Sequence, residues 1–201
     1  MTSRLPFRDS GDLKVAVSAT ETVARAHGVI AIPTETFYGL AVPPDDARAV
    51  QRVLTAKGRP VDKALPVVAA SLEQAEQLVH VPSRWRERLA GVWPAPLTVV
   101  LPLRRPLASA STTLAVRVPA HALLRALLLA TGPLTATSAN LSGAPPIAEP
   151  DGVLASLGAW LELLLDGGVT PGGAPSTLID LTGPQLRVLR EGAWRVPLAW
   201  Q

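Results

Sequence analysis

The stretch V-I-A-I-P-T-E-T-F-Y-G-L, residues 29–40, joins a short apolar run to a polar loop. Its first four residues are apolar and rich in β-branched side chains, which predicts a buried strand. Pro33 ends that strand, because proline donates no backbone hydrogen bond and restricts the residue before it. Residues 11–27 carry apolar side chains at helical spacing, and Gly28 stands at the expected helix stop. The pattern therefore predicts a helix, a strand and then a polar loop.

The same alternation continues along the chain. Asp45 and Asp46 are placed to cap a helix that runs to about Ala56. Ser71 and Gln74 form a capping-box pattern for a helix that runs to Val79. Further helices are expected at 82–91, 120–130 and 151–157, and strands at 65–70, 97–101, 113–118, 134–137, 176–181 and 186–190, with an apolar segment at 160–165. Strands alternate with helices at first and crowd the end, which predicts an α/β fold with a mixed sheet.

The composition favours a single domain over residues 1–201. Of the 201 residues 48% are hydrophobic, and neither a repeat nor a linker divides the chain. The formal charge is +3, from 19 lysines and arginines against 16 acids, and the basic residues form no stripe typical of nucleic-acid binding. The absence of cysteine excludes disulfides and thiolate chemistry. Without a signal-peptide pattern or a membrane-spanning stretch, we expect a soluble, cytoplasmic protein that makes no membrane contact.

Several common catalytic motifs are absent from the sequence. It has no P-loop, no dinucleotide-binding glycine fingerprint, no nucleophile elbow and no zinc-protease motif. The three histidines, His27, His80 and His121, are far apart, and a lone histidine is more often structural than catalytic. We therefore expect no metal held by protein side chains alone, whereas Mg²⁺ bound through the phosphates of a nucleotide stays open.

The segment K-G-R-P-V-D-K, residues 57–63, is a compact cationic loop. It holds two of the only three lysines in the chain, Lys57 and Lys63, on either side of Arg59. Lysine offers a mobile point charge and arginine a planar bidentate fork, and both bind phosphates or carboxylates. Because the chain lacks a P-loop, this loop is the predicted site of phosphate binding.

Other polar side chains stand near the ends of predicted strands, where open α/β sheets bind ligands. They are Thr34, Thr36, Tyr38, Arg117, Ser138, Asn140, Ser142, Ser176 and Arg190. This set has many cations, hydroxyls and amides but no catalytic triad and no paired acids. Such a set suits phosphoryl or nucleotidyl transfer, in which positioning and charge stabilisation dominate.

Each of these residues also has an ordinary structural explanation. Thr34 and Thr36 can be turn hydroxyls, and the S-A-N segment that begins at Ser138 can be a simple turn. Tyr38 can be a core ring whose hydroxyl is bonded. Arg117 lies in an otherwise apolar strand, so it must pair with an acid or face a cavity, because an unpaired buried charge is costly.

Seven segments of the chain resemble, in the same order, those of the YrdC-type threonylcarbamoyl-adenylate synthases. They are I-P-T-E-T-F-Y-G-L, A-K-G-R-P-V-D-K-A-L-P, W-P-A-P-L-T-V-V-L, L-A-V-R-V-P, T-S-A-N-L-S-G, P-S-T-L-I-D-L and V-L-R-E-G-A, within about residues 14–194. The resemblance implies a YrdC-like α/β fold, a twisted open mixed β-sheet with flanking helices around a positively charged cleft, in the short, single-domain branch. It also implies that ATP, with Mg²⁺, reacts with L-threonine and bicarbonate to give threonylcarbamoyl-AMP and pyrophosphate. That product serves threonylcarbamoyladenosine (t6A) modification of tRNA at position 37.

The resemblance assigns roles to individual residues. Lys57 and Arg59 take the catalytic positions. The positions expected to hold L-threonine or its carbamate are Thr34, Thr36, Tyr38, Arg117 and Ser176, and those expected around ATP are Arg59, Lys63, Thr113, Ser138, Asn140, Ser142 and Arg190. Lys63 stands where the family often has an asparagine, and Val68 stands where many relatives have a histidine near the amino-acid site.

Partners follow from the same resemblance. Threonylcarbamoyl-transferase proteins are expected to take the product onward, and contact with tRNA or double-stranded RNA is an open possibility. The alternative function is a non-catalytic RNA-binding protein of the same fold, although the intact K-G-R and S-A-N segments argue against it. A carbamoyl-adenylate chemistry like that of hydrogenase-maturation carbamoyltransferases is disfavoured by chain length.

Overall fold

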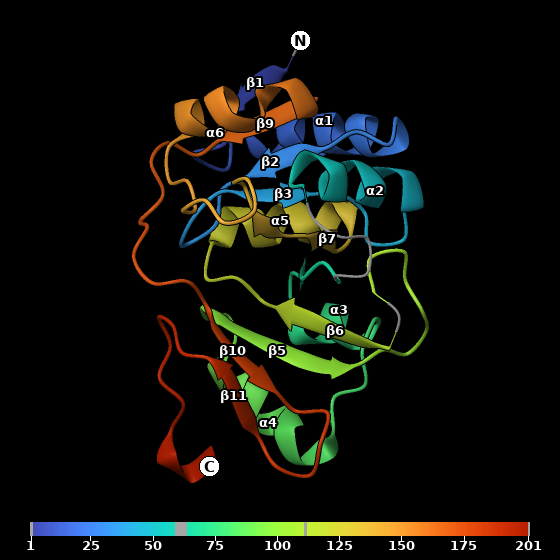
Figure 1. Cartoon of the computed structure of the whole chain (residues 1–201), viewed down its shortest axis with the longest axis vertical. Helices are drawn as coiled ribbons and strands as arrows, with labels where there is room; N and C mark the ends of the chain where they lie inside the picture. Colours follow the sequence, from blue (N-terminus) through green and yellow to red (C-terminus); the bar gives the residue numbers. More distant parts are fainter. Residues whose placement is uncertain (1, 59–63, 111, 201) are drawn as a thin grey trace.

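The computed structural model describes residues 2–58, 64–110 and 112–200. Over these residues the chain forms two mixed β-sheets with helices packed against them (Figure 1). The helices are α1 (Leu13–Arg25), α2 (Ala47–Ala56), α3 (Leu72–Glu76), α4 (Ser83–Val92), α5 (Ala122–Thr131) and α6 (Pro150–Leu157), with 3-10 turns η1 (Gly158–Trp160) and η2 (Leu198–Trp200). The expected α/β class with mixed strand directions is confirmed, with the strands divided between two sheets.

The first sheet has the order β1 (Ser3–Pro6), β9 (Leu163–Asp166), β2 (Ile30–Ile32), β3 (Gly39–Ala41) and β8 (Thr137–Ser138). Strands β1 and β2 run parallel to β9, whereas β3 is antiparallel to both β2 and β8. Helices α1 and α5 cover one face, and α2 and α6 cover the other. Strand β2 is therefore buried on both sides, as a continuous apolar run predicts.

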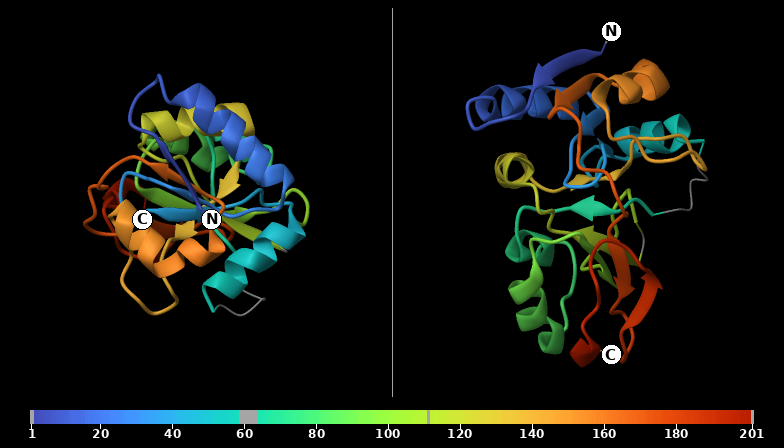
Figure 2. Two further views of the ribbon diagram at one scale, coloured as in Figure 1. Left: turned by 90° about the horizontal axis from the view of Figure 1, so that it is seen from above. Right: turned by 90° about the vertical axis from the view of Figure 1, so that its left-hand side faces the viewer.

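The second sheet has the order β11 (Arg187–Arg190), β10 (Thr177–Asp180), β5 (Leu97–Pro102), β6 (Thr113–Arg117), β4 (Val67–Val68) and β7 (Leu134–Thr135). Helices α3 and α4 pack on one face, as Figure 2 shows, against alternate residues of β5 and β6 such as Val99 and Val116. The intervening residues point to the opposite face, because side chains alternate along a strand. That face, which we call the polar face, carries Thr98, Thr113 and Arg117.

The segment 134–138 connects the two sheets. The sequence predicts one strand here, but the chain forms β7 in the second sheet, passes through Ala136, and forms β8 in the first. Ala136 still donates its amide to Pro66 at 2.8 Å. Thr135 joins both sheets, since its hydroxyl accepts the Val42 amide at 3.0 Å while its own amide bonds the Val42 carbonyl at 2.9 Å. The two sheets therefore meet just before the S-A-N segment.

Local signals account for most helix ends. Asp46 caps α2 by accepting the amides of Arg48 and Ala49, and Ser71 caps α3 by accepting the Gln74 amide. At the end of α1 it is His27, not Gly28, that takes the left-handed conformation, with φ 57°. Gly28 is needed for close packing instead, because an added Cβ would lie 2.5 Å from Val23 Cγ1.

Helix α3 and strands β1 and β3 differ from expectation. Helix α3 ends at Glu76 rather than Val79, because Val79 pairs with Leu103 in a β-bridge. Strands β1 and β3 were not predicted, since each is short and depends on partners distant in sequence.

None of the helices within the described ranges has both the length and the apolar character needed to cross a bilayer.

Acid is expected to weaken the fold through buried carboxylates. Burial alone would raise the pKa of Asp166, but hydrogen bonds from the Gly168 amide and Arg4, with the positive charges of Arg4 and Arg8, lower it. The pKa of Asp180 is lowered against burial in the same way, by Thr182 and Arg187. A carboxyl with a lowered folded-state pKa stabilises the protein above its unfolded-state pKa and loses that contribution as the pH falls through its folded-state pKa.

We therefore expect the free energy of unfolding to fall as the pH drops below about 4, the ordinary pKa of aspartate. Urea denaturation at pH 7, 5 and 3 measures it. Asp166→Asn should show a smaller loss between pH 5 and 3 than the wild type, because an amide has no proton to gain. Glu87→Gln, at an exposed site on α4, is the control and should follow the wild type. Parallel curves for wild type and Asp166→Asn would contradict the prediction.

Candidate active site

The loop after β2 is closed by Thr34. Its hydroxyl accepts the amides of Thr36 (3.2 Å) and Phe37 (3.3 Å) and donates to the Phe37 carbonyl at 2.8 Å. The hydroxyls of Thr34 and Thr36 lie 3.1 Å apart, and both residues are buried. The Thr36 carbonyl accepts the Gly172 amide at 2.7 Å, which ties this loop to the 167–175 loop. Thr34 therefore makes the turn expected of it as a structural residue, and that turn leaves Glu35 pointing toward the second sheet.

Arg117 pairs with Glu35 across the two sheets. Arg117 Nη1 donates to Glu35 Oε1 at 2.9 Å, and the two side chains are only 9% and 12% exposed. Burial lowers the pKa of Arg117, the Glu35 charge opposes that shift, and the nearby Arg190 charge adds to it. Sequence reasoning missed Glu35, although an arginine in an apolar strand requires a partner and Glu35 is the one acid of the T-E-T loop.

Ser176, Arg190 and Thr98 form a second polar group beside Arg117. Arg190 donates to the Ser176 carbonyl from Nη2 (2.8 Å) and Nε (3.2 Å), and the Ser176 hydroxyl lies 2.8 Å from that of Thr98. Strands β5 and β6 are antiparallel, and Val99 of β5 lies opposite Val116 of β6. One residue further along, Thr98 of β5 therefore faces Arg117 of β6. The structure thus brings together Arg117, Ser176 and Arg190. It adds Thr98, which sequence reasoning missed because a threonine in a strand carries no functional signal.

Lys57 ends α2 and reaches the S-A-N segment. Its ammonium donates to the carbonyls of Ser138 (2.5 Å) and Asn140 (2.7 Å) and lies 3.4 Å from Asn140 Oδ1. The Ser142 amide bonds the Lys57 carbonyl at 3.2 Å. Lys57 is 4% exposed, whereas the side chains of Ser138 and Ser142 are exposed. Residues from two distant motifs are therefore held in one cluster, which we call the lysine cluster (Lys57, Ser138, Asn140 and Ser142).

Tyr38 lies in the core of the first sheet. Its ring is fully buried, and its hydroxyl donates to the Gly168 carbonyl at 2.8 Å and accepts the Gly167 amide at 3.1 Å. Burial raises the pKa of Tyr38 to about 12. These contacts match the structural explanation, in which Tyr38 anchors the 167–175 loop.

The remaining predicted residues have different positions. Thr113 shares the polar face with Arg117, four residues along β6, roughly 13 Å at the usual rise of a strand. Val68 pairs with Arg117 in the parallel register of β4 and β6, so the position where many relatives have a histidine adjoins the arginine. Arg59 and Lys63 lie outside the described residues.

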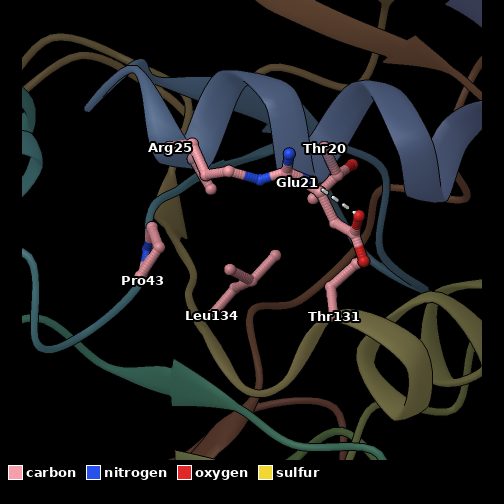
Figure 3. Close-up of a pocket in the computed structure, with 7 residues that line it drawn as sticks. Thr20, Glu21, Arg25, Pro43, Thr131 and Leu134 are labelled. Carbon is pink, nitrogen blue, oxygen red and sulfur yellow. Dashed lines mark hydrogen bonds and ion pairs between the residues drawn. The ribbon is translucent and has the colours of Figure 1, made fainter.

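None of the residues that line two pockets of the described structure belongs to these clusters. One of about 330 Å³ is lined by α1 residues including Thr20, Glu21 and Arg25 and by Pro43 and Leu134 (Figure 3). The other, of about 380 Å³, lies next to Ser176 and Arg190 in sequence and is lined by Thr177, Val188, Glu191, Gly192, Trp194, Arg195 and Val196. In the part of the chain that the structure describes, no group of three or more histidine, cysteine or acidic side chains is placed to hold a metal ion.

Comparison with known proteins identifies the same family as the sequence motifs. The Sua5/YciO/YrdC family model, described as telomere recombination, matches residues 22–192. The chain belongs to the Sua5/YciO/YrdC family. The matched range contains both sheets' site residues, from the T-E-T loop through Arg190.

Among the relatives in this family are curated threonylcarbamoyl-AMP synthases. The chain is 41% identical over 182 residues to one from Shigella boydii, covering 86% of this chain and 95% of the relative. It is also 41% identical over 170 residues to one from Pyrococcus abyssi, covering 82% of this chain. The chain spans only about half of that relative's length, 50%.

A solved structure of P. abyssi Sua5 complexed with L-threonine has the same fold as this Sua5/YciO/YrdC chain. The TM-score is 0.85 at 35% identity, and the match covers 95% of this chain and 58% of that one. The similarity therefore extends over both sheets.

Proposed function

We propose that this chain joins L-threonine, bicarbonate and ATP into threonylcarbamoyl-AMP, with release of pyrophosphate, at the junction of its two sheets. It is a threonylcarbamoyl-AMP synthase, a nucleotidyltransferase of t6A modification of tRNA. The observation that carries this proposal is about 40% identity to curated synthases over more than four fifths of the chain. Contact with tRNA and with a downstream transferase stays a prediction.

The amino acid is assigned to the end of the polar face that holds Arg117. A carboxylate or carbamate suits a guanidinium with donors to spare, and Ser176 and Thr98 add hydroxyls beside it. Thr36 lies on the same side, next to Glu35 in the loop that pairs with Arg117. A relative of the same fold, P. abyssi Sua5, was solved in complex with L-threonine, which supports L-threonine as the amino acid.

ATP is assigned to the lysine cluster and to the Thr113 end of the polar face. Lys57 brings positive charge to the loop whose exposed hydroxyls, Ser138 and Ser142, are suited to phosphate oxygens. Arg59 and Lys63 follow Lys57 in sequence and are proposed to add charge there. Mg²⁺ is proposed to arrive as part of the substrate MgATP, since it commonly takes phosphate oxygens as ligands.

The reaction needs positioning and charge stabilisation more than covalent help. The threonine amine first forms a bond to the carbon of bicarbonate, and water is lost to give the N-carboxylate. An oxygen of this N-carboxylate then forms a bond to the α-phosphorus, and the bond from that phosphorus to the bridging oxygen breaks. The electron pair leaves with pyrophosphate. Because the N-carboxylate is already an anion, its attack on the α-phosphate requires no general base. Lys57 and Arg59 are proposed to offset the negative charge that gathers at the α-phosphate.

Pyrophosphate release from purified protein tests the proposal. Turnover should require ATP, L-threonine and bicarbonate together. L-serine lacks one methyl group, so its kcat/KM should be about 10–200-fold lower, the range that one such group gives in a pocket. Pyrophosphate release that ignores both threonine and bicarbonate, or none under any condition, would overturn the proposed function.

A further inference from the structure

The Glu35–Arg117 pair is a contact that the proposed reaction does not explain. Glu35 comes from the loop between β2 and β3 in the first sheet, and Arg117 ends β6 in the second. The pair therefore crosses between the sheets at the amino-acid end of the site. Glu35 is neither a predicted substrate contact nor part of the charge that faces the phosphates.

The geometry of this pair is incomplete. Arginine and a carboxylate commonly pair through two parallel bonds, but here only Nη1 and Oε1 take part, at 2.9 Å. The second carboxylate oxygen, Oε2, is buried without a hydrogen-bond partner in the described residues. A buried oxygen without a donor is costly, and such an exception in a native protein calls for an explanation. A pair with both carboxylate oxygens bonded would stabilise the fold more than this one does.

The single bond has a consequence for Arg117. Within the described ranges no protein acceptor takes its Nε or Nη2, so one edge of the guanidinium keeps its donors. Arg190 is close enough for its charge to act on Arg117, and it is itself anchored on the Ser176 carbonyl. Two guanidinium groups with one carboxylate leave one unit of positive charge, which suits an anionic group of a ligand.

We propose that Glu35 is a positioning residue for the amino-acid substrate: it holds Arg117 by one N–H so that the opposite edge of the guanidinium binds the carboxylate of L-threonine. The inference rests on the proposed function and deepens it, because it names the residue that orients the threonine-binding arginine. Glu35 acts through Arg117 and makes no contact with the substrate. Without its charge, Arg117 is repelled by Arg190 and loses a defined orientation.

Steady-state kinetics of Glu35→Gln tests this role. The amide keeps the size and one acceptor but removes the charge. We expect the KM for L-threonine to rise on the order of tenfold, as for the loss of a charged hydrogen bond, while the KM for ATP stays within about twofold. If Glu35→Gln does not fold, Glu35→Asp replaces it: the shorter acid loses the bond to Arg117 Nη1, so the same selective rise in the KM for L-threonine is expected.

Glu162→Gln is the matched control. Glu162 also pairs with an arginine, Arg52, at 2.6 Å and accepts the Val29 amide at 2.7 Å, but it lies away from the polar face. Its loss should lower the unfolding temperature and leave both KM values unchanged. If Glu35→Gln only lowers the unfolding temperature and leaves both KM values unchanged, or raises both KM values equally, the inference is overturned. A wild type without threonine-dependent turnover would instead overturn the proposed function.

Discussion

Lys57→Ala is expected to lower kcat on the order of 10²–10³-fold, the cost typical of removing one charge contact to a transition state. The side chain has two tasks. Its ammonium is proposed to face the charge that develops at the α-phosphate, and it also binds the carbonyls of Ser138 and Asn140, which shape the nucleotide loop. Pyrophosphate release at saturating substrate concentrations measures the effect.

Lys57→Arg and Lys14→Ala make this experiment specific. A guanidinium is planar, and it does not replace an ammonium among oxygens gathered around one nitrogen, so Lys57→Arg should not restore activity. Lys14 is exposed on α1, and its loss should leave kcat unchanged. Near-normal turnover by Lys57→Ala would remove Lys57 from the mechanism, and near-normal turnover by Lys57→Ala together with Arg59→Ala would remove the cationic loop.

Arg117→Met is expected to abolish threonine-dependent turnover and to destabilise the protein by roughly 3–5 kcal/mol, the cost of leaving one partner of a buried ion pair uncompensated. The partner left behind is Glu35, which is 12% exposed and already has one oxygen without a donor. Urea denaturation at pH 7 gives the change in the free energy of unfolding.

The double variant Arg117→Met/Glu35→Leu separates the two effects. Replacing both members of a buried pair by apolar residues is often neutral or stabilising, so the double variant should regain most of the lost stability. It should not regain activity, because no guanidinium remains to bind the substrate carboxylate. A double variant that turns over substrate would show that Arg117 serves the fold rather than the reaction.

The sequence predicted those parts of the fold that depend on neighbouring residues. The caps of α2 and α3 were assigned correctly, because each side chain bonds an amide two or three residues away. The long strands β5 and β6 were found because their apolar patterns are strong. Strand β1 was missed, since its residues are mostly exposed and it forms only by pairing with β9, about 160 residues later.

The residues of the candidate site were also predicted where a local motif marks them and missed where none does. The motifs selected Lys57, Arg117, Ser138, Asn140, Ser176 and Arg190, and the structure brings them into two clusters. Glu35 and Thr98 were not selected, because a single acid in a loop and a threonine in a strand carry no local signal. The sequence also suggested both roles for Tyr38, and only its buried hydroxyl contacts distinguish them.

By itself the sequence determined the α/β class, the family and the kind of chemistry, because strand and helix patterns and short motifs are properties of neighbouring residues. Only the tertiary structure decided that the strands form two sheets and that Ala136 lies where the chain passes between them. It also decided that Arg117 meets Glu35, 82 residues away, and that Lys57 reaches Ser138, 81 residues away. The physical reason is that a buried charge must find a partner in space, and no local pattern specifies which distant residue that partner is.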